Sequence, residues 1–163
     1  MTVKKPESFD HLLLYAQIRQ ESGFNPKAVS RAGAKGLMQI MDATFKEWSK
    51  RIGLKNADPF NPLHNIIIGC LELNRQIENF GDLTLALTAF NWGSGNLTKF
   101  INQAGTKDFE KLKNFIGKRR NSDGEMVDWP MPKEAKEYAQ RVFNHYADPS
   151  TMEQADDYLK IAA

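Results

Sequence analysis

The stretch IRQESGFNPKAVSRAGAKGLMQIM occupies residues 18–41 and places a carboxylate where a helix is expected to end. Leu14, Ile18 and Glu21 are separated by four and three residues, the spacing of one helix face. Gly23 follows at once and interrupts the helical pattern. Glu21 is therefore predicted to lie at the open end of an otherwise apolar helix face.

A carboxyl group in this position is a candidate general acid. Burial disfavours its ionised form and raises its pKa, and a neutral carboxylic acid at the edge of a cleft can donate a proton. On this segment alone, a Glu21 that points to water in a frayed last turn is the better-supported interpretation. Gly33 and Gly36 indicate tight turns just after it, in a loop of the kind that carries binding groups.

Composition limits the class of protein. The 163 residues are 41% apolar and 26% charged, which is typical of one globular domain with its own core. A net charge of +2 is too small to indicate nucleic acid as the main partner. Cys70 is the one cysteine of the sequence, so the fold has no internal disulfide. Its apolar neighbours favour a small buried side chain.

No run of about 18 apolar residues is present, so no membrane-spanning segment is expected. The beginning of the sequence, MTVKKPESFDHLLLYAQ, has an apolar patch that is too short and too polar for a signal peptide. We therefore expect no signal peptide.

Helical periodicity dominates the rest of the chain. Ser8 is predicted as the N-cap of the first helix and Asp42 as the cap of the second. Asp123-Gly124 indicates a turn inside a loop or small hairpin. Further helices are expected at 62–80, 82–92, around 97–101 and from 132 to about 146. The prediction is a mainly α chain with at most a small β-hairpin, divided into a domain at 1–146 and a tail or short helix at 147–163.

Four blocks of sequence, in this order, resemble the soluble lytic transglycosylase (SLT) family. The first is the segment Glu21–Met41, with its Glu-Ser, Phe-Asn-Pro and Gly-Leu-Met-Gln-Ile-Met elements. The others are DPFNPLHNIIIGCLEL from Asp58, ALTAFNWGSGNL at 86–97 and PKEAKEYAQRV at 132–142. A Glu-Ser pair alone carries no weight, but four ordered blocks spanning most of the chain are specific. The resemblance implies a lysozyme-like fold of the goose-lysozyme/SLT type in a single domain.

The same resemblance implies an activity. The family cleaves the β-1,4 bond between N-acetylmuramic acid and N-acetylglucosamine in peptidoglycan and leaves 1,6-anhydromuramic ends. Glu21 aligns with its single general acid and base, which accounts for the lack of a second carboxylate at a suggestive spacing, since hydrolases usually need a pair. The resemblance implies no cofactor and no metal.

Seven further positions match substrate-binding positions of the family: Ser30, Gln39, Met41, Phe90, Asn91, Glu134 and Tyr138. Several of them also have a plainer interpretation, and Met41 can belong to the core at a helix edge. Ser30 can be a turn residue, Asn91 a helix cap, and Glu134 a first-turn acid that favours the helix dipole. Phe90 stands where the family usually has Tyr, so a hydroxyl is missing there.

Two other functions remain open. One is a goose-type muramidase, which uses water in place of the sugar hydroxyl. The other is a non-catalytic peptidoglycan-binding virion module, for which Phe90 is the one supporting feature. We expect the partner to be peptidoglycan glycan strands rather than nucleic acid, and the chain to be a monomer. The expected place of action is the periplasm or cell wall, in phage lysis, as part of a virion or in a secretion system, with the phage-like role favoured.

Overall fold

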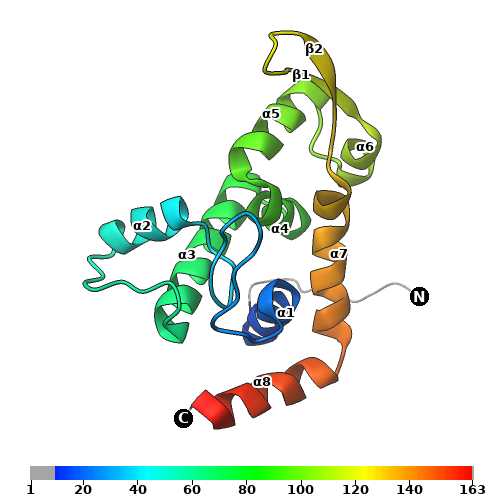
Figure 1. Ribbon diagram of the computed structural model, residues 1–163. Helices are drawn as coiled ribbons and strands as arrows, with labels where there is room; N and C mark the ends of the chain where they lie inside the picture. The colour runs from blue at the N-terminus through cyan, green and yellow to red at the C-terminus, as the bar shows by residue number, and fades with distance from the viewer. Residues whose placement is uncertain (1–9, 163) are drawn as a thin grey trace. The chain divides into compact units, whose positions relative to one another are not determined.

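The computed structural model describes residues 10–162, and in this range the chain is mainly helical with one hairpin, as predicted (Figure 1). The helices are α1 (His11–Ser22), α2 (Asp42–Arg51), α3 (Pro62–Phe80), α4 (Leu83–Trp92), α5 (Ser94–Ala104), α6 (Phe109–Asn114), α7 (Lys133–Ala147) and α8 (Ser150–Ala162). The strands are β1 (Ile116–Arg120) and β2 (Met126–Pro130).

The chain divides into two compact units. The first comprises Met1–Arg75 and Arg141–Ala163, and the second comprises Gln76–Gln140. The boundaries between them fall within α3 and α7. These compact units are not the domain at 1–146 and the tail at 147–163 that the sequence predicts, and that division stays a prediction. Residues 150–162 of the predicted tail form α8.

The first helix begins later than predicted. Ser8 lies outside the described residues, and Asp10 is the N-cap, with its Oδ1 accepting the backbone N–H of Leu13 at 2.7 Å. The helix ends at Gly23, which has a φ of 58° and donates its N–H to the carbonyl of Arg19. This left-handed glycine cap closes α1 directly after the turn that contains Glu21.

The prediction that Asp42 caps α2 is wrong. Met41 is the N-cap and makes no side-chain capping bond, while Asp42 is the first helical residue. Its carboxylate instead accepts two bonds from Lys35 Nζ, at 2.8 and 2.9 Å. This ion pair lowers the pKa of Asp42. The acidic side chain therefore fastens the preceding loop to the start of α2.

The predicted starts of the two central helices are confirmed. Asn61 Oδ1 accepts the N–H of His64 at the beginning of α3, and Asp82 Oδ1 accepts the N–H of Leu85 at the beginning of α4. Helix α6 was not predicted. Asp108 caps it, but its six residues are too few to show periodicity.

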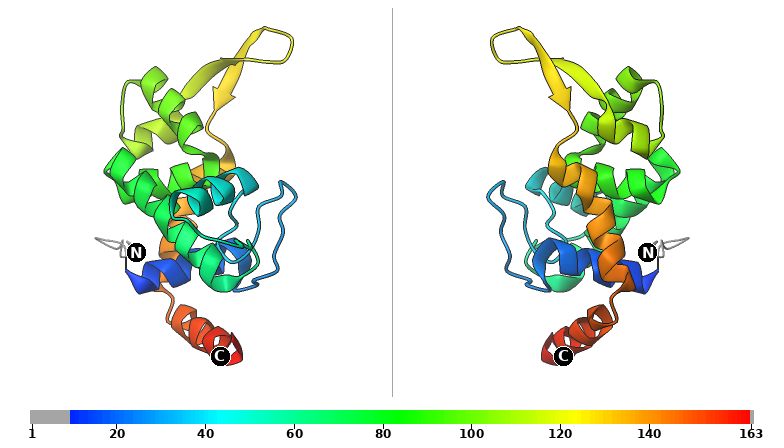
Figure 2. Two further views of the ribbon diagram at one scale, coloured as in Figure 1. Left: turned by 90° about the vertical axis from the view of Figure 1, so that its left-hand side faces the viewer. Right: turned by 90° about the vertical axis from the view of Figure 1, so that its right-hand side faces the viewer.

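Aromatic side chains form the core of the second unit. Trp92, at the end of α4, lies 5.3 Å from the Phe100 ring and 5.4 Å from the Trp129 ring. The hairpin is antiparallel, and its Gly117 pairs with Trp129 and faces Phe100 closely. Gln103 of α5 exchanges hydrogen bonds with the backbone of Lys118, which joins this helix to β1. Figure 2 shows the hairpin from two further sides.

Candidate active site

The last turn of α1 carries Glu21. The side chain is half-buried, on a helix whose inner face is buried through Leu13, Ala16, Gln17 and Ile18. The expected position at the helix end is confirmed, but of the predicted face only Ile18 is buried, while Leu14 and Glu21 are half-buried at its edge. A half-buried carboxyl group at a helix end can be reached by a ligand and is still partly shielded from water.

The backbone that follows Glu21 is unusual because two consecutive residues adopt left-handed conformations. Gly23 has a φ of 58° and Phe24 a φ of 63°. Glycine accepts this region freely, but a side chain with a Cβ is strained there. Phe24 is held in place by burial, since only 9% of it is exposed. Such strain persists only where surrounding contacts determine the backbone.

Ser30 builds a turn. Its Oγ accepts the backbone N–H of Ala34 at 3.0 Å, and its own N–H donates to the Ala34 carbonyl at 2.9 Å. Ser30 is therefore a turn residue, as its plainer interpretation expects. The hydroxyl hydrogen is not used in these bonds, so a contact with a ligand is compatible with the turn.

Gln39 is fixed by the loop that contains it. Its Nε2 donates to the carbonyls of Gly36, at 2.9 Å, and Ala28, at 3.2 Å. The backbone at Gln39 is left-handed, with a φ of 47°. Because the two N–H groups of the amide are used within the loop, its carbonyl oxygen is the group left to accept a bond from a ligand.

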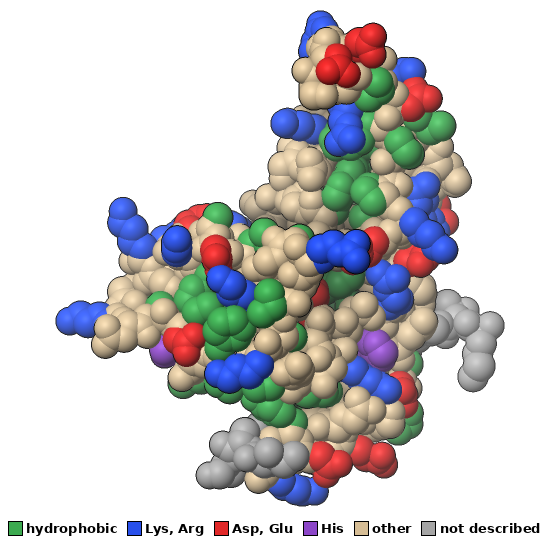
Figure 3. Space-filling model, in the orientation of Figure 1, with side chains coloured by type: hydrophobic (Ala, Val, Ile, Leu, Met, Phe, Trp, Pro, Cys, Tyr) green, Lys and Arg blue, Asp and Glu red, His purple; other side chains and the backbone are tan. Residues whose placement is uncertain are grey.

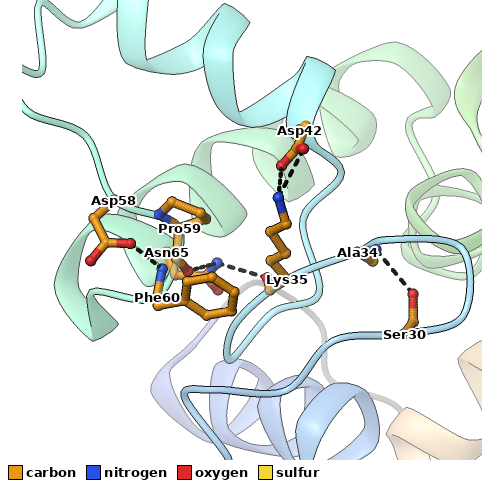
Figure 4. A network of polar contacts seen from close by, with 8 residues as sticks. All are labelled: Ser30, Ala34, Lys35, Asp42, Asp58, Pro59, Phe60 and Asn65. Atoms are coloured by element: carbon orange, nitrogen blue, oxygen red, sulfur yellow. Dashed lines mark hydrogen bonds and ion pairs between the residues drawn. The ribbon is translucent and has the colours of Figure 1, made fainter.

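Asn65 holds this loop against the start of α3, as Figure 4 shows. Its Oδ1 accepts the N–H of Met38 at 2.7 Å, and its Nδ2 donates to the carbonyls of Lys35 and Pro59, both at 2.9 Å. Asn65 is completely buried. Its amide thus joins three backbone positions and determines the path of the segment that contains Gln39.

Met41 follows the loop and precedes α2. The side chain is 46% exposed, so it belongs to the surface rather than to the core. The Lys35–Asp42 ion pair lies immediately beside it in the sequence and links the loop to the helix (Figure 4). An exposed apolar side chain at this place is available to contact a ligand.

The second unit contains the other four predicted site residues. Asn91, in α4, donates from Nδ2 to Glu134 Oε1 of α7 at 3.4 Å, a long hydrogen bond. Asn91 is half-buried and Glu134 is exposed. The third and fourth blocks of the sequence pattern therefore meet through these two side chains. Asn91 lies inside α4, whose C-cap is Gly93, so its interpretation as a helix cap is wrong.

Phe90 and Tyr138 differ in exposure. Phe90 is half-buried, whereas Tyr138 is only 1% exposed and is among the largest fully buried side chains. Tyr138 and Glu134 are four residues apart on α7, but Tyr138 is buried and Glu134 is exposed. Tyr138 therefore contributes to packing in this structure, and a direct role in substrate binding stays a prediction.

On the face drawn in Figure 3, acidic and basic side chains are interspersed. No large area of this face therefore carries charge of one sign only. Several lysines of residues 107–128 are paired, such as Lys113 with Glu110 and Lys118 with Asp128. In residues 10–162 no group of three or more His, Cys, Asp or Glu side chains is placed to hold a metal ion. No described helix is long and apolar enough to cross a membrane.

Two residues that support the site, Asn65 and Arg19, are not among the positions predicted from the sequence. Asn65 lies in the apolar run HNIIIG, where a polar residue on a buried helix face is the signal that could have indicated its role. Arg19 gave no comparable signal. It binds Asp148 and Thr151, which are more than 120 residues further along the chain.

Comparison with known proteins identifies the family. The sequence model of the transglycosylase SLT domain family matches residues 3–113, about two thirds of the chain. This chain therefore belongs to the SLT family, as its four sequence blocks indicated.

Two curated relatives illustrate the range of the family. The transglycosylase of Enterobacteria phage PRD1 is 34% identical over 108 residues, which cover 58% of this chain and 38% of the relative. The soluble lytic murein transglycosylase of Escherichia coli is 36% identical over 96 residues, 55% of this chain and 15% of the relative. The chain thus spans well under half the length of each of these relatives.

Solved structures confirm the lysozyme-like fold of the SLT type. The 70 kDa soluble lytic transglycosylase of Escherichia coli matches 85% of this chain, with a TM-score of 0.65 and 27% identity, over 22% of its own length. The lytic transglycosylase Slt of Pseudomonas aeruginosa matches 91% of this chain, with a TM-score of 0.64 and 26% identity, over 22% of its own length. The latter structure is of an inactive mutant in which a glutamate is replaced by glutamine.

Proposed function

We propose that this chain is a lytic transglycosylase that cleaves the β-1,4 bond between N-acetylmuramic acid and N-acetylglucosamine in peptidoglycan. The product end is a 1,6-anhydromuramic acid, and Glu21 acts as the single general acid and base. The observation that carries the proposal is the position of Glu21, half-buried at the end of α1 and followed by a loop that is held by backbone hydrogen bonds such as those between Lys35 and Ile40.

One carboxyl group performs both proton transfers in this mechanism. Glu21 first protonates the glycosidic oxygen, and the bond from this oxygen to C1 of the muramic residue breaks. The acetamido carbonyl oxygen of the same sugar stabilises the positive C1. The Glu21 carboxylate then removes the proton of the C6 hydroxyl, and O6 forms a bond to C1. No water is consumed, and Glu21 is protonated again at the end.

A solved relative supports a requirement for a glutamate. Replacement of a glutamate by glutamine, an almost isosteric change that removes the acid, accompanies inactivity in the Pseudomonas aeruginosa protein. We propose the same requirement for Glu21, because it aligns with the family's acid in the first sequence block.

We propose substrate contacts for the remaining residues of the pattern. Within the first unit, Gln39 offers a carbonyl oxygen that suits an N–H or O–H group of a sugar. Ser30 offers a hydroxyl hydrogen and Met41 an exposed apolar surface. Within the second unit, Asn91 and Glu134 are proposed to bind the substrate as the linked pair that they form, and Phe90 and Tyr138 to support them.

The proposed partner is therefore peptidoglycan glycan strands, and the proposed place of action is the cell wall. A role in phage lysis or in a virion is supported by the similarity to the transglycosylase of phage PRD1. A monomeric state stays a prediction, which size-exclusion chromatography with light scattering would test.

The deciding experiment is mass spectrometry of soluble muropeptides released from purified peptidoglycan. We expect products that end in 1,6-anhydromuramic acid, each lighter by one water than the corresponding reducing sugar. Reducing muramic ends would instead identify a goose-type muramidase. No release by the folded protein would contradict both enzymatic functions and favour the non-catalytic binding module.

A variant with a matched control tests the role of Glu21. E21Q is expected to lose lysis while keeping its circular dichroism spectrum and its melting temperature. E153Q makes the same chemical change at an exposed position of α8 and is expected to retain wild-type lysis. Lysis by E21Q at the wild-type rate would contradict the assignment.

A further inference from the structure

We infer that α8 is a positioning element for the end of α1 that carries Glu21, and that it acts through Phe24 and Arg19. The inference rests on the proposed role of Glu21. The family model ends at residue 113, whereas α8 covers Ser150–Ala162, so the pattern that defines the family does not include this helix. Figure 1 shows α8 beside α1 in the first unit.

The first contact is between two aromatic rings. The centroids of Phe24 and Tyr158 are 6.0 Å apart, with an angle of 31° between the ring planes. Phe24 is the residue whose backbone is held in the left-handed region directly after Gly23. A strained conformation of this kind needs a surrounding contact that favours it over relaxed alternatives. Tyr158 supplies an apolar surface against which the Phe24 ring packs.

The second contact is polar. Arg19 Nη1 donates to Asp148 Oδ2 and to Thr151 Oγ1, each at 2.8 Å. Thr151 is completely buried and donates in turn to the carbonyl of His145 at 2.6 Å. Asp148 also accepts the N–H of Ser150 at the beginning of α8. The guanidinium is therefore bound to the corner between α7 and α8.

These two contacts lie on either side of the proposed acid in the sequence. Arg19 precedes Glu21 by two residues, and Phe24 follows it by three. The carbonyl of Arg19 also accepts the N–H of Gly23, the bond that closes the helix. A last turn without such support frays, because its carbonyl groups have no further helical partners.

The expected consequence concerns the rate of the chemical step. A general acid has to be held close to its productive position, and a displacement of about 1 Å can lower the rate by about 100-fold. Loss of the Tyr158 ring would allow the segment after Glu21 to relax. Because Tyr158 is not one of the proposed binding residues, the defect should appear in kcat and not in KM.

The test compares three single variants of the full chain: Y158A, Y158F and Q154A. Y158A removes the ring. Y158F keeps it and removes a hydroxyl that has no hydrogen-bond partner among the described residues. Q154A changes an exposed residue of the same helix. Muropeptide release is measured well below the melting temperature of every variant, so that the folded fraction is equal.

We expect Y158A to lower kcat by about 10- to 100-fold, with KM within about twofold of wild type. Y158F and Q154A are expected to match wild type. Equal kcat values for Y158A and Y158F would overturn the inference. If Y158A does not fold, Y158L replaces it, because leucine preserves apolar volume without a ring, and the same criterion applies.

A measurement that needs no turnover separates this inference from the proposed function. NMR-detected hydrogen exchange at the Gly23 amide reports the last turn of α1 directly. We expect faster exchange in Y158A than in Y158F and Q154A, whether or not the wild type releases muropeptides. Equal exchange rates of the Gly23 amide in the three variants would overturn the inference. A wild-type protein that does not release muropeptides would overturn the proposed function alone.

Discussion

The side-chain amide of Asn65 accepts the backbone N–H of Met38 at 2.7 Å and thereby connects the start of α3 to the loop that follows α1. The same amide donates to the carbonyls of Lys35 and Pro59. All its strong hydrogen-bonding positions are directed to backbone groups. One buried side chain thus adds to the backbone hydrogen bonds of this irregular segment, such as the pair between Lys35 and Ile40.

This arrangement predicts that N65A is strongly destabilised. Truncation leaves the Met38 N–H and two carbonyls without their partner, so we expect a loss of about 2–4 kcal/mol in the free energy of unfolding. Urea denaturation measures it. The exposed Asn102 on α5 provides the control, and N102A should stay within about 0.5 kcal/mol of wild type. If N65A lowers the free energy of unfolding by no more than N102A does, water substitutes for the amide.

Two glycines of the same loop form a matched pair. Gly36 and Gly33 both have left-handed backbones, with φ of 76° and 88°. A Cβ at Gly36 would overlap the Asn65 side chain and the Pro59 carbonyl, whereas a Cβ at Gly33 meets open space. G33A should therefore lose about 1 kcal/mol from backbone strain alone, and G36A about 1–3 kcal/mol more. Equal melting temperatures for the two variants would contradict the close approach seen at Gly36.

The corner between α7 and α8 predicts a dependence of stability on pH. Partial burial and the nearby Arg19 lower the pKa of His145 below its usual 6.5. The unfolded chain then binds a proton at a higher pH than the folded chain does, so stability falls as the pH drops from about 7 through 6.5 and below. The pKa of Asp148 is also lowered, by hydrogen bonds from Ser150 and Arg19, so its contribution is lost at still lower pH.

H145Q tests the histidine contribution. The variant cannot take up the proton, so its free energy of unfolding should change less than that of wild type between pH 7 and 5. Urea denaturation at a series of pH values measures the difference. H11Q, at an exposed histidine, serves as the control and should follow the wild-type curve. If the free energy of unfolding of H145Q changes with pH as steeply as that of wild type, His145 is not the cause of the loss of stability.

Cys70 predicts a slow reaction with thiol reagents. Burial raises the pKa of its thiol from 9.0 to about 11, which lowers the thiolate fraction at pH 8 about 100-fold. Labelling with Ellman's reagent should be about 10- to 100-fold slower for the folded protein than for the same protein in urea. Equal rates would show that the α3 segment around Cys70 opens readily.

Sequence patterns determined much of the helical framework. The helix starts near 62 and 82 can be predicted because capping depends on one side chain and the three residues after it, here those of Asn61 and Asp82. Four short blocks were sufficient to indicate the family, since their spacing is specific. The position of Glu21 at a helix end followed from the break at Gly23. All of these features are local, and local interactions can be read along the chain.

The tertiary structure alone decided the supporting contacts. Asp42 was expected to cap a helix but pairs with Lys35, and Asp10 caps α1. The partners of Asn65 lie up to 30 residues away, and those of Arg19 more than 120 residues away. Burial, the strained φ of Phe24 and its contact with Tyr158 also arise only when distant segments meet. Such contacts depend on packing between segments, for which sequence spacing carries no periodic signal.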